Sequence, residues 1–113
     1  MRERRKYVRL RAPIGVAYKI VKGPKTRSKS TLRDISGGGL MLVANENLRA
    51  GDLLDLEIHI PLSGEPIQAV GEVVWFTAGD GRDRQREAGV KFRDIDPQEL
   101  HRILEYVHTV AIG

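Results

Sequence analysis

The sequence predicts a mainly β domain, a barrel or a sandwich of about six or seven short strands, followed by one C-terminal helix. Apolar and polar residues alternate in several short segments, which is typical of strands with one buried face. Turns that contain Gly or Pro separate these segments at short intervals. The end of the chain instead repeats its apolar residues every three to four positions, as an amphipathic helix does.

A length of 113 residues fits one domain, and no internal repeat or linker divides the chain. We expect a basic arm over residues 1–12 and a single domain over residues 13–113, with the helix at about 96–110. The absence of cysteine excludes disulfides and thiolate metal sites. The charged start is not typical of a secretory signal, and no apolar run reaches the roughly 20 residues of a membrane span. We therefore expect a soluble, cytoplasmic protein.

Three strands are expected in the first half of the chain. Segment Ile14–Ile20 alternates apolar residues with small or polar ones, as a half-buried strand does. The polar segment 22–30 contains Gly23-Pro24 and is expected to be a hairpin loop. A short strand over 30–34 follows, and three consecutive glycines then interrupt regular structure before an apolar strand over 40–44.

The second half is expected to contain three more strands. Residues 54–60 alternate most clearly, with leucines and isoleucines on one face and acidic residues and His59 on the other. Segment 67–77 is rich in β-branched and aromatic residues. Segment 87–92 is expected to be its hairpin partner across a turn at 79–81.

A helix is expected to start at Asp96, because this residue can act as the N-cap. Pro97 suits the first helical position, and Glu99 stands where a capping box has its acid. The apolar residues that follow share one face of the helix, and they are Leu100, Ile103, Leu104 and Val107. This face is expected to pack against the β-sheet core.

The net charge of +4 hides a strong asymmetry along the chain. Residues 1–33 hold twelve Lys or Arg against one Glu, a net charge of +11, whereas residues 34–113 carry −7. A basic third of this kind indicates an anionic partner such as a phosphorylated small molecule, a nucleic acid or a membrane surface. A solvated basic arm with no partner is the alternative.

No set of residues suited to catalysis or metal binding is visible. His59 lies on the polar face of a strand, and His101 and His108 lie about 10 Å apart along the expected helix. The sequence contains no metalloprotease, nucleophile-elbow or P-loop motif. We therefore expect neither an enzyme nor a metal protein.

Two short patterns remain as candidates for ligand binding. The first is an RxxxR formed by Arg5 and Arg9, with Arg4 directly before it. The second is a DxSxxG at positions 34–39, formed by Asp34, Ser36 and Gly39. Each pattern is weak alone, because arginine pairs are common in basic segments and DxSxxG is also typical of a tight turn.

Together the two patterns suit a ligand that carries both guanine and phosphate. Guanidinium groups can bind phosphates and the O6 and N7 acceptors on one edge of guanine. A carboxylate such as that of Asp34 can accept hydrogen bonds from the N1–H and the amino group on the other edge, with Ser36 beside it. A phosphate alone would not need Asp34, because a carboxylate repels it.

The order of the two motifs resembles the PilZ domain, a bacterial receptor for cyclic di-GMP. The resemblance rests on RKYVR at 5–9 and DISGGG at 34–39. It continues through GEVVW at 71–75, GVKF at 89–92 and the IDPQELHRILEYV ending, and so covers nearly the whole chain. It implies a six-stranded antiparallel barrel with an accompanying helix.

The resemblance also implies a set of ligand-binding residues, and these are Arg4, Arg5, Arg9, Asp34, Ser36, Gly38 and Gly39. Arg5 and Arg9 would bind guanine Hoogsteen edges and phosphates, and Asp34 and Ser36 the Watson–Crick side. An arginine at the position of Arg4 accompanies an intercalated ligand dimer in this family, so two ligands per domain are implied. The arm would close over the ligand and signal to an unknown protein partner, with outputs such as motility or exopolysaccharide synthesis.

Alternative interpretations stay open. A basic β-barrel that binds nucleic acid would explain the charge asymmetry, but only 5% of the residues are aromatic and they are not interleaved with the basic ones. A degenerate, non-binding interaction module is the other alternative. For Trp75 we expect packing in the core or at the barrel rim, with a stacking platform as the alternative.

Overall fold

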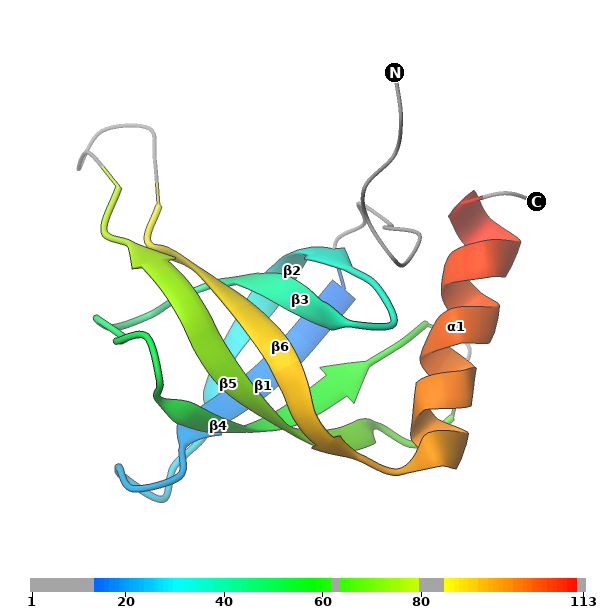
Figure 1. Cartoon of the computed structure of the whole chain (residues 1–113), viewed down its shortest axis with the longest axis horizontal. Helices are drawn as coiled ribbons and strands as arrows, with labels where there is room; N and C mark the ends of the chain where they lie inside the picture. The colour runs from blue at the N-terminus through cyan, green and yellow to red at the C-terminus, as the bar shows by residue number, and fades with distance from the viewer. Residues whose placement is uncertain (1–13, 62–63, 80–84, 112–113) are drawn as a thin grey trace.

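The computed structural model describes residues 14–61, 64–79 and 85–111. The elements are β1 (Ile14–Ile20), β2 (Ser28–Ile35), β3 (Gly39–Val43), β4 (Leu53–His59), β5 (Ile67–Thr77), β6 (Glu87–Ile95) and α1 (Pro97–Ala111). The strands form a closed antiparallel barrel in the order β1-β2-β3-β6-β5-β4 (Figure 1). Strand β1 closes the ring by pairing with both β2 and β4. The six-stranded barrel with a C-terminal helix is thereby confirmed.

Two strand boundaries differ from the prediction by two residues or more, and the others agree to within one residue. Strand β2 begins at Ser28 instead of residue 30, because Ser28 and Lys29 already pair with Tyr18 and Ala17 of β1. Strand β6 continues to Ile95 instead of ending near residue 92, since its last residues pair with the start of β5. Both extensions come from cross-strand pairing, which the local pattern of a single strand does not contain.

Alternating apolar side chains fill the interior of the barrel. Strand β4 shows the pattern most plainly: Leu54, Leu56 and Ile58 are fully buried, while His59 at its end is exposed. The inward residues of the other five strands join the same core. One contiguous core therefore supports every wall of the barrel, including the wall that carries the predicted motif.

Helix α1 stands beside one end of the barrel (Figure 1). The Gln98 N–H donates to the Asp96 carboxylate at 2.8 Å, so Asp96 is the N-cap, as predicted. Ile103 and Val107 of the predicted apolar face are fully buried in the barrel core, whereas Leu100 and Leu104 are only half-buried. The Arg102 guanidinium also donates to the Glu65 carbonyl oxygen at 2.6 Å, and this bond ties α1 to the segment before β5.

Two of the three register shifts in the strand pairing change the direction in which side chains near the predicted motif point. In β2 the register shifts between Leu32 and Asp34, and as a result Leu32 and Ile35 both reach the core although they are three positions apart. In β5 the register shifts between Val73 and Trp75. The first shift lies in the β2–β3 pair and the second in the β5–β6 pair. Both therefore lie in the half of the barrel formed by β2, β3, β6 and β5, which contains the predicted motif.

The predicted arm over residues 1–12, with Arg4, Arg5 and Arg9, lies outside the described residues. Within the described ranges, α1 is the one helix, and it is neither long nor apolar enough to cross a membrane.

Candidate ligand-binding site

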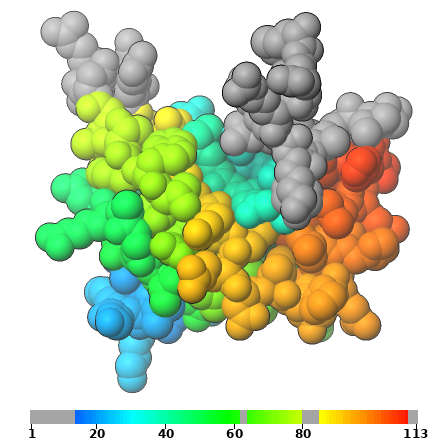
Figure 2. All heavy atoms as spheres, in the orientation of Figure 1, coloured from blue at the N-terminus to red at the C-terminus, as the bar shows by residue number. Residues whose placement is uncertain are grey.

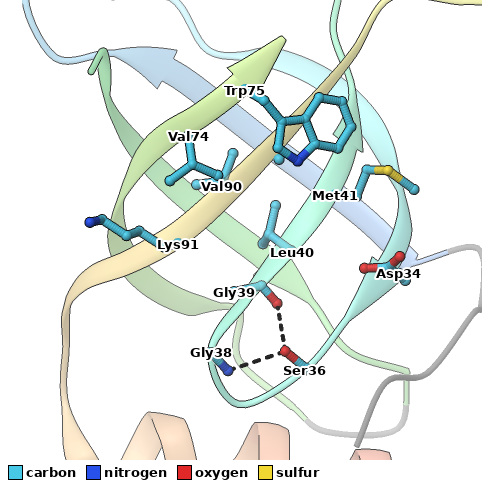
Figure 3. Close-up of a pocket in the computed structure, with 11 residues that line it drawn as sticks. Asp34, Ser36, Gly38, Gly39, Leu40, Met41, Val74, Trp75, Val90 and Lys91 are labelled. Atoms are coloured by element: carbon cyan, nitrogen blue, oxygen red, sulfur yellow. Dashed lines mark hydrogen bonds between the residues drawn. The ribbon is translucent and has the colours of Figure 1, made fainter. Parts of the chain in front are cut away.

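A tight turn joins β2 to β3 and contains most of the DxSxxG motif. The Ser36 N–H donates to the Gly39 carbonyl oxygen at 2.9 Å. The Ser36 hydroxyl accepts from the Gly38 N–H at 3.2 Å and donates to the Gly39 carbonyl oxygen at 3.4 Å (Figure 3). Ser36 thus shapes the turn, the structural role that such a motif also predicts. One lone pair of its hydroxyl oxygen is left for a further donor.

Gly39 brings this turn close to the backbone of β6. It is the first residue of β3, although the break in structure was predicted over Gly37–Gly39. A Cβ at Gly39 would overlap the Val90 carbonyl oxygen. Beside it, the Gly38 carbonyl oxygen accepts from the Phe92 N–H at 3.0 Å. The third glycine of the motif is therefore required by the packing of the barrel itself.

A row of four cross-strand neighbours runs over the outer face from β2 to β5. Asp34 pairs with Met41, Met41 with Gly89, and Gly89 with Trp75. Neighbouring strands lie about 4.8 Å apart, so the row spans at most about 14 Å between the α-carbons of Asp34 and Trp75. It places a carboxylate at one end, an indole at the other and a glycine between them.

The bulge in β5 puts Trp75 on this outer face. Strict alternation from the buried Val73 would point Trp75 inward and Phe76 outward. The register shift reverses this arrangement: Phe76 packs against the core, and Trp75 is 43% exposed. Of the two positions expected for Trp75, the core and the barrel rim, the exposed fraction excludes the core, because a bulge changes the face without changing the residue pattern.

A pocket of about 240 Å³ lies along the row (Figure 3). Its lining residues are Asp34, Ser36, Gly38, Gly39, Leu40, Met41, Val74, Trp75, Gly89, Val90 and Lys91. The four predicted site residues within the described ranges, those of the DxSxxG motif and Gly38, thus lie together. The space-filling view shows the turquoise β2–β3 turn between β6 and α1 (Figure 2).

Asp34 and Lys91 carry opposite charges on opposite sides of the pocket (Figure 3). Asp34 is 4% exposed, so its carboxylate is shielded from bulk water although it lines the pocket. Lys91 extends from β6, and its side chain is 51% exposed. Lys91 was not among the predicted site residues. The sequence feature that could have identified it is that Lys91 is the one charged residue within the GVKF segment.

Two of the three histidines in the described ranges lie beside carboxylates. His59 Nε2 lies 3.0 Å from Glu57, and His101 Nε2 lies 3.5 Å from Glu105. The bonds from Gln68 and His59 lower the pKa of the Glu57 carboxyl. No group of three potential metal ligands occurs within the described part of the chain.

Comparison with solved structures shows the same fold in bacterial proteins of low sequence identity. The Bacillus subtilis inhibitor of motility MotI/DgrA is 22% identical, with a TM-score of 0.82 over 97% of this chain and 52% of that protein. The PilZ domain of Escherichia coli YcgR with c-di-GMP is 16% identical, with a TM-score of 0.71 over 96% of this chain and 95% of that domain. The K. pneumonia MrkH–c-di-GMP complex is 18% identical, with a TM-score of 0.75 over 97% of this chain and 52% of that protein.

The chain thus spans about half the length of MotI/DgrA and MrkH. A search of curated proteins finds no match. The model of the PilZ domain family matches residues 3–109. PilZ domains are binding receptors, which agrees with the prediction that the chain is not an enzyme. The sequence match and the closed six-stranded barrel lead to one conclusion: the chain belongs to the PilZ domain family.

Proposed function

We propose that this chain is a receptor for cyclic di-GMP and that it binds the ligand in the pocket between Asp34 and Trp75. The observation that carries the proposal is the cross-strand row, in which a shielded carboxylate and an exposed indole face one pocket. A flat base with hydrogen-bond donors matches both ends of that row, because its donors suit the carboxylate and its face suits the indole.

Asp34 and Ser36 bind the Watson–Crick edge of one guanine. The Asp34 carboxylate accepts from the N1–H and the amino group, and its low exposure strengthens these bonds by excluding water. The Ser36 hydroxyl uses its free lone pair to accept a further N–H. Trp75 offers its ring as a surface on which a base stacks.

The basic arm supplies the cations that the ligand phosphates need. Strand β1 begins at Ile14, which pairs with Leu32, two residues before Asp34. Arg9 precedes Ile14 by five residues, and five extended residues span at most about 18 Å. Arg9 and Arg5 are therefore within reach of the pocket, where they bind phosphates and Hoogsteen edges.

Arg4 extends the site to two stacked ligands. Its guanidinium packs on a purine face of an intercalated cyclic di-GMP dimer, as the motif resemblance implies. Residues 1–12 act as the arm and residues 13–113 as the domain it closes on. Closure changes the surface that the domain presents to a protein partner.

Isothermal titration tests the proposal directly. We expect micromolar or tighter binding of cyclic di-GMP, with two ligands per chain, and much weaker binding of GTP and single-stranded DNA. No heat with the cyclic dinucleotide overturns the proposal, and equal binding of random DNA favours a nucleic-acid-binding barrel instead. A stoichiometry of one would retain the receptor function but remove the role of Arg4.

Substitutions in the arm separate ligand binding from folding. Arg5→Ala and Arg9→Ala are expected to abolish binding while leaving the thermal midpoint of the free protein unchanged. Arg11→Ala is the matched control, because it removes the same charge from the same segment outside the motif. A large loss of thermal stability in the first two variants would make those arginines structural.

Asp34→Ala tests the recognition of guanine. We expect this variant to lose its preference for cyclic di-GMP over the hypoxanthine analogue, which lacks the amino group. The preference of the wild-type protein is the reference. An unchanged preference in the variant would show that Asp34 does not contact that edge.

Closure of the arm is tested by limited proteolysis near Arg9. Ligand is expected to slow cleavage, because a closed arm is less accessible. Equal cleavage rates with and without ligand would contradict closure.

A further inference from the structure

Lys91 is the cationic side chain of the pocket within the described residues, and neither motif contains it. It lies directly across from Gly39 on β3 and from Glu72 on β5. Gly39, Lys91 and Glu72 therefore form a second cross-strand row. On the outer face this row is adjacent to the one that joins Asp34 to Trp75. The side chain starts beside the β2–β3 turn and is half exposed, so its four-carbon stem is free to move.

Glu72 holds Lys91 only loosely. The Lys91 ammonium is 3.9 Å from the Glu72 carboxylate, which is beyond hydrogen-bond distance. The Arg93 guanidinium is 2.8 Å from the same carboxylate oxygen. Arg93 therefore keeps Glu72 paired when Lys91 leaves, and an exposed ion pair of this length stabilises the protein very little.

We infer that Lys91 is a phosphate-binding residue of this pocket. Its ammonium group moves from Glu72 to an anionic group of the ligand. The inference rests on the proposed function and adds a residue to it. Asp34 repels phosphate from one side of the pocket, whereas Lys91 attracts it to the other side. The two charges thereby orient a ligand that has hydrogen-bond donors at one end and phosphate at the other.

The barrel contains a second triad of the same kind, which provides a matched control. The Lys19 ammonium lies 4.0 Å from Asp55, and Asp55 is also paired with Arg27 at 3.4 Å. Strand β1, which carries Lys19, lies three strands around the barrel from β6. Lys19 does not line the pocket. Lys19→Gln therefore removes the same charge from an equivalent ion pair away from the ligand.

The test is titration of cyclic di-GMP into the wild-type protein, Lys91→Gln, Lys91→Arg and Lys19→Gln. Loss of one charge-assisted hydrogen bond is expected to weaken binding by Lys91→Gln roughly tenfold. Lys91→Arg should retain most of the affinity, and Lys19→Gln should bind like the wild type. Added salt should weaken binding to the wild type more steeply than binding to Lys91→Gln, because one screened attraction is missing in the variant.

Three outcomes would overturn the inference. Wild-type affinity in Lys91→Gln would show that Lys91 does not contact the ligand. Equal weakening in Lys91→Gln and Lys19→Gln would show an effect of net charge alone. A wild-type protein that gives no heat would overturn the proposed function itself, and the inference with it.

Discussion

The indole of Trp75 occupies the space that a side chain on Gly89 would need. A Cβ at Gly89 would overlap three atoms of the ring, including Nε1. The two residues are direct neighbours across β5 and β6. The position of the indole in the pocket therefore depends on the absence of a side chain on the opposite strand.

Gly89→Ala is expected to displace the indole and to weaken cyclic di-GMP binding roughly tenfold, the scale of one lost base–aromatic contact. Trp75 is the only tryptophan in the chain, so its emission reports on this pocket alone. We expect ligand to change the fluorescence of the wild-type protein and to change that of Gly89→Ala much less. An unchanged emission spectrum in the free variant, with unchanged affinity, would contradict the dependence of Trp75 on Gly89.

Gly39→Ala is expected to destabilise the free protein by roughly 2 kcal/mol or more. The new Cβ would overlap the backbone of β6, and the two strands cannot move apart without disturbing their hydrogen bonds. Gly15→Ala is the matched control. Its Cβ would meet only the Cβ of His59, at an ordinary contact distance of 3.9 Å. Urea unfolding of both variants without ligand measures the difference, and equal midpoints would show that β3 and β6 separate easily.

Tyr18 should make the stability of the protein depend on alkaline pH. Its hydroxyl donates to Glu46 at 2.6 Å and accepts from the Asn45 N–H at 2.8 Å. Burial, followed by the hydrogen bond to Glu46, raises the pKa of Tyr18 from 10.0 to about 12. Because the folded pKa is the higher one, this contribution to stability is complete below the unfolded pKa and is lost as pH rises towards the folded pKa.

The measurement compares the free energies of unfolding of the wild-type protein and Tyr18→Phe. The difference between them should be about 1 kcal/mol smaller near pH 11 than near pH 8. Tyr18→Phe removes only the titrating hydroxyl, so other groups that titrate at high pH affect both proteins equally. A difference that stays constant with pH would show that the hydroxyl titrates normally in the folded state.

The spacing of apolar residues along the chain was sufficient to predict the strands and the helix, whereas the six-stranded barrel was implied by the resemblance to the PilZ domain. Strand β4 and helix α1 each bury one face whose period is visible in the residues themselves. The nonlocal pairs were not visible in this way. Strand β3 lies beside β6 although β4 and β5 separate them in sequence, and nothing in the local pattern of Gly39 or Lys91 predicts that they are neighbours.

The same limit explains which parts of the site could be predicted. Asp34 and Ser36 belong to a contiguous motif, so their proximity follows from sequence spacing. Trp75 enters the pocket through a bulge, and Gly89 matters only because Trp75 lies over it. A one-residue register shift reverses the facing of every residue beyond it, and alternation alone cannot locate the shift.

The ring formed by the six strands also limits how a protein partner could bind this domain. Each strand has a hydrogen-bonded neighbour on both sides, so no strand among the described residues offers an unpaired edge. A partner therefore cannot join by adding its own strand to the sheet. Because the register of a closed ring cannot slide, the barrel acts as a fixed frame. On the proposed function, the free and ligand-bound states would therefore differ in what the outer wall and the arm present to a partner, and not in the pairing of the strands.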